Sequence, residues 1–227
     1  MKFNARYERN FQMLSLEEMN TIKKKRVAII GLGGLGGYVL EQFTRLGIGS
    51  LVLCDGDIFQ ESNLNRQLLA TEENMGRKKA SVAAKRVSDI NSEVQVSACE
   101  DFFTAENGIQ ILENVDVVID CLDQVQPRLL LEKIATKCNV PLVHGAIAGW
   151  YGQVAVSMPG DGILAKIYHG IEKIPNLLGN PSFTPGVVAS FEVAEALKII
   201  LGRGEILRHQ LLLLDLYSLE FNMVNLQ

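Results

Sequence analysis

The stretch that most constrains the fold is residues 27–55, which read VAIIGLGGLGGYVLEQFTRLGIGSLVLCD. An apolar run typical of a buried strand leads into a cluster of glycines. A segment with the apolar spacing of a helix follows, and then a second apolar run that ends in Asp55. Gly31, Gly33 and Gly36 have the GxGxxG spacing of the phosphate-binding turn of a βαβ unit. The stretch therefore predicts a strand, a tight turn, a helix and a second strand.

Each glycine of this turn has its own steric reason. Gly31 permits the tight turn, Gly33 lets a ligand approach the backbone, and Gly36 lets the helix pack against its strand. The helix N-terminus offers free N–H groups and a partial positive charge to an anion. Asp55, at the end of the next strand, can accept hydrogen bonds from ribose hydroxyls. These residues predict a nucleotide site; the alternative is a tight strand-to-helix turn without a ligand.

Predicted strands and helices alternate along the first two thirds of the chain. Strands are expected at residues 26–30, 51–55, 94–98, 115–120 and 141–144, and helices over 35–46, 78–90, 105–113 and 128–138 separate most of them. An earlier helix, 16–25, is expected to begin at a capping box formed by Ser15 and Glu18. Alternating strands and helices predict an α/β fold with a Rossmann-like, doubly wound and mainly parallel sheet.

The pattern changes after residue 150. Residues 152–158 predict another strand, whereas residues 159–186 contain four prolines and are expected to form an irregular crossing loop. A helix is expected at roughly 187–201 with Gly202 as its C-cap. Residues 211–224 alternate as a hairpin would, so antiparallel strands are expected at the C-terminal edge of the sheet.

No repeat or linker divides the chain, so one domain over residues 1–227 is expected. Its parts are an N-terminal helical segment (1–25), a nucleotide-binding core (26–150) and a C-terminal part (151–227). The composition is that of an ordinary globular protein, with 48% hydrophobic and 21% charged residues. The formal net charge of −4 gives no reason to expect a nucleic-acid partner. No apolar run is long enough to cross a membrane, and no secretion signal is visible.

The four cysteines bear on metal binding and on location. Cys54, Cys99 and Cys121 lie in or beside apolar strand-like runs, where a cysteine is usually a small core residue, and Cys138 lies elsewhere. No CxxC spacing occurs, so a zinc site is not expected. This cysteine usage best fits the reducing cytoplasm.

Polar residues follow the second predicted strand. Asp57 and the segment 62–67 lie beyond its carboxyl end, where ligands bind in open α/β sheets. Arg66 in this segment has the planar donor fork that suits a phosphate; the alternative is a solvated loop arginine. Residues 76–79 (GRKK) place three cations at a helix N-terminus, against the helix dipole. A nearby anionic ligand would relieve that cost; the alternative is a basic surface unrelated to a site.

Carboxylates also follow the strand predicted at 115–120. Asp120 and Asp123 at its end suit Mg²⁺, which binds through one or two carboxylates plus phosphates. The alternative is that Asp123 caps the next helix. His144 stands at a strand end and is expected to be a structural histidine. No Ser-His-Asp order, HExxH motif or nucleophile elbow occurs, so the chemistry should need neither a side-chain nucleophile nor a strong general base.

Together these features resemble the adenylyltransferases that activate ubiquitin-like sulfur carriers, namely the ThiF/MoeB/HesA group and the ubiquitin-activating enzymes. The resemblance covers nearly the whole chain, and it is specific because the motifs occur in this order and spacing. The motifs are Arg6-Tyr7-x-Arg9, Gly31-Leu-Gly-Gly-Leu-Gly36, Asp55-x-Asp57, Ser62-Asn63-Leu64-x-Arg66-Gln67, Gly76-x-x-Lys79, Asp120-Cys-x-Asp123, Gly152-Gln153 and Glu195-Ala196-x-Lys198.

The resemblance implies roles for individual residues. ATP would lie over the glycine turn near Gly34, with its ribose held by Asp55. The further implied roles are phosphate binding by Arg66 and Lys79, Mg²⁺ binding by Asp123, and lining of the pocket by Asn63 and Gln67. Arg9 would come from the partner subunit of a homodimer, and residues 151–227 would bind the carrier protein.

The implied reaction is attack by the C-terminal glycine carboxylate of a small ubiquitin-like protein on the α-phosphorus of ATP. Pyrophosphate leaves and an acyl adenylate remains. A terminal carboxyl has a pKa of about 3.5, so it is already an anion at neutral pH and needs no base. Cations and a metal that stabilise phosphoryl charge are then the main requirement.

The sequence departs from this family pattern at three places. Many relatives carry two CxxC pairs that bind zinc, and many place a reactive cysteine in the crossing loop; residues 150–186 contain no cysteine. This chain is therefore expected to adenylylate only. Gln124 stands where many relatives have Asn, beside Asp123 in the expected pocket. The alternatives are an NAD-dependent oxidoreductase, which would share the glycine turn and Asp55, and an inactive nucleotide-binding adaptor of the same fold.

Overall fold

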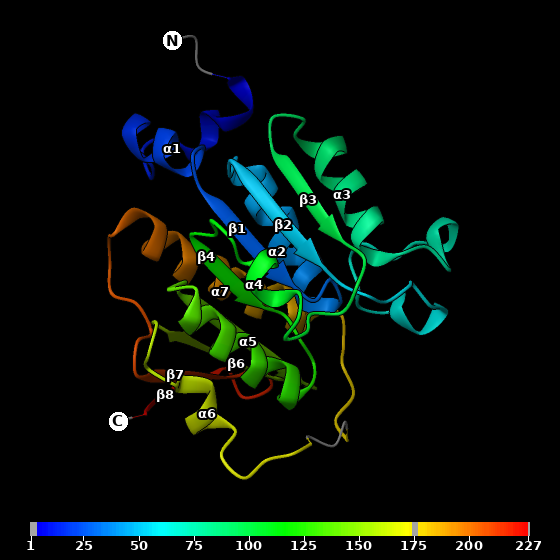
Figure 1. Ribbon diagram of the computed structural model, residues 1–227, viewed down its shortest axis with the longest axis vertical. Coiled ribbons are helices and arrows are strands. Elements are labelled where there is room, and N and C mark those ends of the chain that lie inside the picture. The colour runs from blue at the N-terminus through cyan, green and yellow to red at the C-terminus, as the bar shows by residue number, and fades with distance from the viewer. Residues whose placement is uncertain (1–3, 174–176, 227) are drawn as a thin grey trace.

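A single mixed sheet organises the computed structural model, which describes residues 4–173 and 177–226. Its eight strands run in the order β3-β2-β1-β4-β5-β6-β7-β8 (Figure 1). The strands are β1 (Arg26–Ile30), β2 (Ser50–Cys54), β3 (Gln95–Cys99), β4 (Val117–Asp120), β5 (Leu142–Ala148), β6 (Tyr151–Ser157), β7 (Gln210–Asp215) and β8 (Glu220–Asn225).

The helices cover both faces of this sheet. In Figure 1, α4 and α5 lie in front of the sheet, and α2 and α7 lie behind it. The α-helices are α1 (Leu16–Ile22), α2 (Gly34–Leu46), α3 (Lys79–Ile90), α4 (Gly108–Ile111), α5 (Val125–Lys137), α6 (Ile163–Ile167) and α7 (Phe183–Leu201). Short 3₁₀ turns are η1 (Ala5–Asn10), η2 (Glu61–Asn63) and η3 (Glu72–Asn74).

Strand directions confirm the predicted fold class. Strands β1 to β5 pair in parallel, whereas β6, β7 and β8 pair antiparallel. The chain moves outward from β1 through β2 to β3 and then returns to place β4 on the other side of β1. Ligands in open α/β sheets bind at such a reversal, outside the carboxyl ends of the strands. The fold therefore directs attention to the loops after β1, β2 and β4.

Alternate residues of the central strands supply two separate cores. Val27 and Ile29 of β1 pack on the side of α2 and α7, whereas Ala28 and Ile30 pack on the side of α5 and α6. All four are buried. Because both faces of the strand are covered, its sequence is apolar throughout and does not alternate.

The chain beyond residue 150 contains more helix than the sequence predicts. Helix α6 lies inside the predicted crossing loop, and α7 begins at Phe183, ahead of the predicted start. Pro185 is compatible with this earlier start because it lies in the first turn, where its missing N–H costs no helical hydrogen bond. Helix α6 is capped by a residue that is distant in the sequence. The Glu132 carboxylate accepts hydrogen bonds from Leu164 N at 2.8 Å and Ala165 N at 3.1 Å. Only the tertiary structure brings this capping group to α6.

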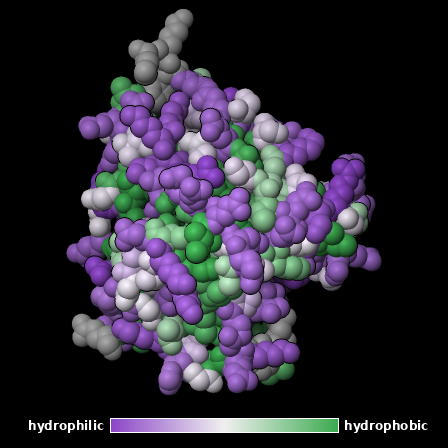
Figure 2. Space-filling view, viewed as in Figure 1, coloured by the Kyte–Doolittle hydropathy of each residue, from purple (hydrophilic) through white to green (hydrophobic). Residues whose placement is uncertain are grey.

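The structure also tests predictions about helix caps, cysteines and membrane segments. The capping box of Ser15 and Glu18 is present, and Gly202 is the left-handed C-cap of α7. Cys54 and Cys121 are buried, but Cys99 is partly exposed because β3 is an edge strand. Within residues 4–173 and 177–226, no helix is long and apolar enough to span a lipid bilayer. Polar side chains cover most of the face shown in Figure 2.

Candidate functional site

The glycine turn joins β1 to α2 under tight steric limits. Gly31 has φ of +92°, and a Cβ there would lie 2.6 Å from the Cys121 carbonyl oxygen. A Cβ on Gly36 would lie 1.9 Å from the Gly31 carbonyl oxygen. At Gly33, by contrast, the nearest atom to an added Cβ is the Gln67 amide nitrogen at 3.6 Å. Packing therefore requires glycine at positions 31 and 36. At position 33, the missing side chain leaves the backbone of the turn accessible to a ligand.

Helix α2 begins immediately after Gly33, which caps it without a side-chain hydrogen bond. The first N–H groups of a helix have no partner within the helix, and they carry the positive end of its dipole. Because the N-cap of α2 is a glycine, no N-cap side chain accepts hydrogen bonds from these N–H groups. The turn thus has the donor arrangement that binds a phosphate.

Asp55 ties the end of β2 to this turn. One carboxylate oxygen accepts a hydrogen bond from Leu32 N at 2.7 Å, and the other accepts one from Asp57 N at 2.8 Å. A carboxylate has about four acceptor positions, so capacity for ribose hydroxyls remains. The contact also gives Asp55 a structural role, because it fixes the backbone between the first two glycines.

The segment after η2 lies over the start of α2. The Arg66 side chain passes beside Gly34, with Cγ 3.9 Å from the position of an added Cβ. Its guanidinium donates to the Ser62 carbonyl at 2.9 Å and to Asn65 Oδ1 at 2.8 Å, and it remains partly exposed. Arg66 is thus held next to the glycine turn with further N–H donors for an anion.

Two amide side chains of this segment are buried, with different consequences. Asn63 Oδ1 accepts a hydrogen bond from Gln60 N at 3.0 Å and so shapes the turn. The Gln67 side chain lies beside Gly33 with its amide nitrogen nearest, and its buried Oε1 has no hydrogen-bond partner within residues 4–173 and 177–226. A buried acceptor without a partner is costly, and such atoms are often satisfied by a ligand or a water. Gln67 Oε1 is therefore an acceptor that a ligand or a water molecule would satisfy.

The predicted cations 77–79 do not act together. The Lys78 ammonium donates to the Gly56 carbonyl at 2.7 Å and to the Glu100 carbonyl at 3.1 Å, so it secures a loop. Lys79 is the first residue of α3, and its ammonium lies 3.1 Å from the Asp57 carboxylate. Asp57 is largely exposed while Lys79 is buried. Among the described residues, Lys79 is the one of these three cations that forms an ion pair with a carboxylate of the segment following β2.

The loop after β4 separates two carboxylates that the sequence predicts as a pair. Asp123 is exposed, whereas Asp120 is fully buried and bound by other side chains. Asp120 is therefore not available to a cation, and only Asp123 remains as a candidate for Mg²⁺. The alternative role for Asp123 is not seen either, because the N-cap of α5 is Gln124, and it forms no side-chain cap.

A single carboxylate still fits Mg²⁺ when phosphates supply the other ligands. Within residues 4–173 and 177–226, no group of three or more His, Cys, Asp or Glu side chains gathers into a metal site. The Cys121 carbonyl contacts the Gly31 turn, so the loop that carries Asp123 lies against the loop expected to hold phosphates. The residues present are thus compatible with a cation shared with a bound nucleotide.

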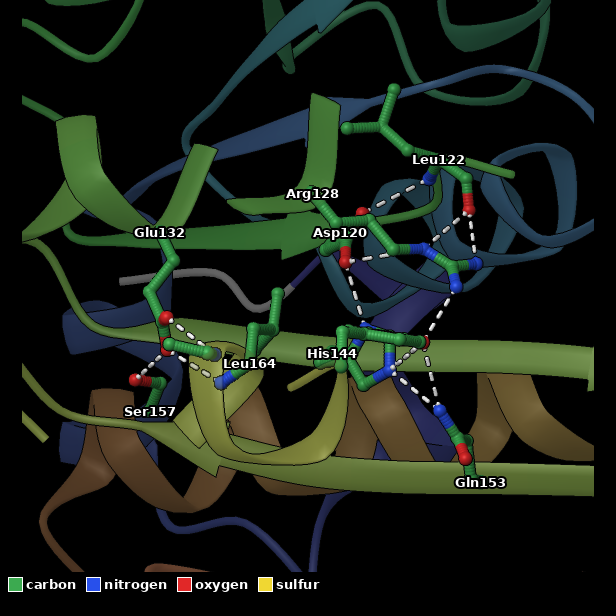
Figure 3. A network of polar contacts seen from close by, with 10 residues as sticks. Asp120, Leu122, Arg128, Glu132, His144, Gln153, Ser157 and Leu164 are labelled. Atoms are coloured by element: carbon green, nitrogen blue, oxygen red, sulfur yellow. Dashed lines mark hydrogen bonds and ion pairs between the residues drawn. The ribbon is translucent and has the colours of Figure 1, made fainter. Parts of the chain in front are cut away.

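Behind this loop lies a buried polar network, shown in Figure 3. Asp120 Oδ2 lies 2.7 Å from His144 Nδ1, and the Tyr168 hydroxyl lies 3.1 Å from His144 Nε2. Gln153 donates from Nε2 to the Tyr168 hydroxyl at 2.9 Å. Arg128 donates to the same hydroxyl at 2.6 Å. The network joins β4, β5, β6, α5 and the end of α6.

Burial sets the protonation of this network. It lowers the pKa of His144, although the hydrogen bond that His144 donates to Asp120 acts in the opposite direction. The neutral imidazole then donates from Nδ1 to Asp120 and accepts at Nε2. Burial raises the pKa of Tyr168 to about 12, so its hydroxyl stays protonated. His144 is a satisfied structural histidine, as the sequence predicts.

Glu192 of α7 adds an unpaired acid beside this network. It is fully buried, and in the described part of the chain neither carboxylate oxygen has a hydrogen-bond partner. Burial raises its pKa well above the ordinary value, and the negative charge of Asp120 adds to the effect. A Cβ on Gly145 would lie 2.4 Å from the Glu192 carboxyl carbon, so β5 leaves room for this side chain only by having glycine there.

Three residues of these clusters escaped the sequence reasoning: Arg128, Tyr168 and Glu192. Glu192 offered a partial signal, since it has apolar neighbours on both sides in a helical segment that also carries Glu195 and Lys198. Arg128 and Tyr168 offered little, because each lies in an ordinary polar stretch. Their role depends on strand pairing that brings distant segments together.

Arg9 is the one predicted site residue that the structure does not bring to this edge of the sheet. It is exposed on η1 and forms no hydrogen bond or ion pair with the part of the chain described. Tyr7 on the same turn packs against Gly47, at the opposite end of α2 from Gly34. The 13 residues of α2 extend about 20 Å at about 1.5 Å per residue. Arg9 therefore stands far from the glycine turn of its own chain.

The fold and this geometry define a nucleotide-binding α/β protein whose phosphate turn lies at the reversal of the strand order. Comparison with known proteins narrows the class. The model of the ThiF family matches residues 7–227. The chain belongs to the ThiF family.

Relatives share most of their length with this chain. A protein of Thermus thermophilus named sulfur carrier protein adenylyltransferase is 36% identical over 90% of this chain and 80% of its own. The SAMP-activating enzyme E1 of Haloferax volcanii is 31% identical over 96% of this chain and 84% of its own. The enzyme class of the chain is accordingly that of an adenylyltransferase.

The fold is also that of a solved structure. E. coli MccB superposes with a TM-score of 0.84 at 21% identity, over 99% of this chain and 70% of that protein. At this level of identity the likeness supports the architecture, including the mainly parallel sheet with antiparallel C-terminal strands.

Proposed function

We propose that the protein uses ATP to adenylylate the C-terminal glycine of a small ubiquitin-like sulfur carrier. The observation that carries this proposal is the glycine turn at the start of α2, where Gly33 leaves the backbone uncovered and the Arg66 side chain passes beside Gly34. A named relative in Thermus thermophilus acts on a sulfur carrier protein. Acyl adenylate and pyrophosphate are the products of the proposed reaction.

The site suits this reaction because it offers cations, and the reaction itself needs no general base. The carrier carboxylate has a pKa of about 3.5, so it attacks as an anion without losing a proton. The barrier comes from bringing two anions together and from charge on the phosphoryl oxygens. The N–H groups of α2, Arg66 and Lys79 would hold the phosphates and compensate that charge. Asp55 would hold the ribose, and Gln67 would accept a hydrogen bond from the nucleotide.

Asp123 is the residue that would hold Mg²⁺ beside the phosphates. When bound, the cation would neutralise phosphate charge. Gln124 follows it as an exposed N-cap whose side chain is free to turn toward a ligand. The exposed position of Asp123 supports this role, because a buried carboxylate such as Asp120 has partners already.

The carrier would dock on the C-terminal part of the chain. Trp150 lies near Phe183, with ring centroids 4.6 Å apart, and near Tyr217, with centroids 5.7 Å apart. All three rings are exposed, at 46%, 42% and 77% respectively. Exposed aromatic clusters of this kind mark protein interaction sites. Every residue of the adjacent edge strand β8 is exposed as well.

Covalent catalysis by a cysteine is not part of the proposal. Burial raises the pKa of the Cys54 and Cys121 thiols, so neither is a ready nucleophile. A homodimer is proposed because Arg9 stands too far from its own glycine turn to reach a nucleotide there. In a dimer it would reach the site of the partner.

Exchange of labelled pyrophosphate into ATP tests the proposal. With Mg²⁺ and a ubiquitin-like protein ending in Gly-Gly, the protein should catalyse exchange, and removal of the last carrier glycine should abolish it. Calorimetric titration with ATP and with NAD provides the control. Binding of NAD in place of ATP would contradict the proposal and favour an oxidoreductase, whereas ATP binding without exchange would favour an inactive adaptor.

A further inference from the structure

The backbone just before Asp123 is held on both sides by buried charged groups. Asp120 Oδ1 accepts a hydrogen bond from Leu122 N at 3.1 Å. Arg128 Nε donates to the Leu122 carbonyl at 3.1 Å, and its Nη2 donates to the same oxygen. Both polar groups of one peptide residue are thus bound by ionised side chains, which form stronger hydrogen bonds than neutral ones. Figure 3 shows this arrangement around Leu122.

Arg128 is itself held by a residue from another part of the chain. The Tyr168 hydroxyl accepts a hydrogen bond from Arg128 Nη1 at 2.6 Å and can donate to His144 Nε2. Arg128 is only 4% exposed, so solvent cannot replace this acceptor. Tyr168 therefore fixes the orientation of the guanidinium that holds Leu122.

We propose that Arg128, anchored by Tyr168, is a positioning residue that directs the exposed Asp123 carboxylate toward a divalent cation. This inference rests on the proposed function, in which Asp123 holds Mg²⁺ beside ATP. Neither residue touches the nucleotide; both act through the backbone of Leu122.

The physical reason lies in the contrast between Asp123 and its neighbours. The Asp123 side chain is exposed, and no hydrogen bond or ion pair with the described chain restrains it. Its direction is consequently set by the peptide that precedes it. Groups that support a metal ligand from behind are worth about 10- to 100-fold in metal affinity. Loss of the Tyr168 hydroxyl leaves a buried N–H of Arg128 without an acceptor, so the guanidinium must turn and release Leu122.

The experiment measures how strongly Mg²⁺ tightens nucleotide binding. The full-length chain is titrated calorimetrically with α,β-methylene-ATP, once with saturating Mg²⁺ and once with EDTA. The ratio of the two dissociation constants reports the metal contribution. The variants are Tyr168→Phe, Arg128→Lys and Asp123→Asn.

Ser157→Ala is the matched control. Ser157 is buried and donates to Glu132 Oε1 at 2.7 Å, so the variant also loses a buried hydroxyl hydrogen bond on α5. It lies on β6, the strand that carries Gln153, yet it has no link to Leu122. A melting scan of each variant shows whether it is folded, and Tyr168→Phe remains available if Arg128→Lys is not.

Asp123→Asn should reduce the Mg²⁺ ratio to near one. Tyr168→Phe and Arg128→Lys should lower it about tenfold while affinity in EDTA stays at the wild-type value. Ser157→Ala should keep the wild-type ratio of dissociation constants, even if its melting temperature falls as much as that of Tyr168→Phe or Arg128→Lys.

Two results would overturn the inference in distinguishable ways. If Tyr168→Phe and Arg128→Lys keep the wild-type ratio while Asp123→Asn loses it, Arg128 has only a structural role and the proposed function stands. If the wild type binds no nucleotide, or if Asp123→Asn keeps the full ratio, the assignment of the site itself fails and the inference fails with it.

Discussion

Two polar clusters lie side by side at the carboxyl ends of β1, β2 and β4, and they differ in almost every physical respect. The open cluster is the proposed site, with Arg66 beside the glycine turn, Lys79 against Asp57, and the exposed Asp123. The closed cluster comprises Asp120 and Arg128, with the residues that Figure 3 joins to them, and it is buried and saturated with hydrogen bonds. Charges in the open cluster have capacity to bind a ligand. The hydrogen-bonding groups of the closed cluster are already bound to other groups of the protein.

This difference predicts that substitutions in the two clusters have opposite consequences. A group with free capacity contributes to reaction and little to stability, since surface charges are worth about 0–1 kcal/mol. A buried charge that loses its partner costs about 3–5 kcal/mol.

The largest effect is expected from Arg9, if it completes the open cluster of a partner subunit. Arg9→Ala and Asp123→Ala homodimers should each lose about 10³-fold or more in adenylate formation, because a cation supplied in trans to a phosphoryl centre is worth that much. Mixed and reassembled dimers should recover toward half of the wild-type rate, since one site pairs an intact Asp123 with an intact Arg9. No recovery in heterodimers verified by mass spectrometry would mean that Arg9 does not act across an interface.

Lys79→Gln should reduce pyrophosphate exchange by about 10²–10³-fold, the range for losing one group that stabilises developing charge. Its free energy of unfolding should fall by less than the loss of about 3–5 kcal/mol expected for a fully buried charge pair, because the partner of its buried ammonium is the largely exposed Asp57 carboxylate, which water can solvate. Lys85→Gln is the control: it lies on the same helix and pairs with Asp89 at the surface. Equal exchange rates in the two variants would remove Lys79 from the open cluster.

Arg128→Ala tests the closed cluster. The substitution leaves the buried Asp120 carboxylate without its cationic neighbour and should lower the free energy of unfolding by about 3–5 kcal/mol in urea titrations. Arg86→Ala removes an exposed arginine that pairs with Glu41 and should cost less than about 1 kcal/mol. A similar small loss in both variants would show that the buried network does not stabilise the fold.

The effect expected at Glu192 depends on pH and is small near pH 5. Unfolded Glu192 ionises near its ordinary pKa of 4.5, but burial keeps the folded residue protonated to higher pH. As pH rises above 4.5, the unfolded state releases a proton that the folded state retains, so stability falls. Glu192→Gln should remove this loss and gain about 1.4 kcal/mol on the wild type per pH unit until folded Glu192 ionises.

Urea titrations between pH 5 and pH 8 measure the effect (about three pH units, ample for a slope of this size). Glu220→Gln, on the exposed strand β8, should leave the pH dependence unchanged. Parallel curves for wild type and Glu192→Gln would mean that Glu192 finds a partner in solution.

The open cluster could be predicted from the sequence far better than the closed one. The spacing of Gly31, Gly33 and Gly36 predicts the turn. Arg66 and Lys79 lie in motifs that resemble those of the family. The prediction failed at Asp120, which looks like a second metal ligand when read along the chain. Its pairing with His144 depends on β4 lying next to β5, where the two residues are register partners. Arg9 could be placed in the site only by resemblance, and its distance from its own glycine turn emerged from the packing of η1.

The sequence by itself determined the parallel sheet, the glycine turn and the antiparallel C-terminal strands. These features follow from local rules, namely the period of apolar residues, the steric freedom of glycine and the capping of helices. Only the tertiary structure decided which carboxylate is free and which is buried. That distinction separates Asp123 from Asp120, three positions earlier. Burial is a property of the neighbours that folding brings together, and the partners of Asp120 come from β5 and α5.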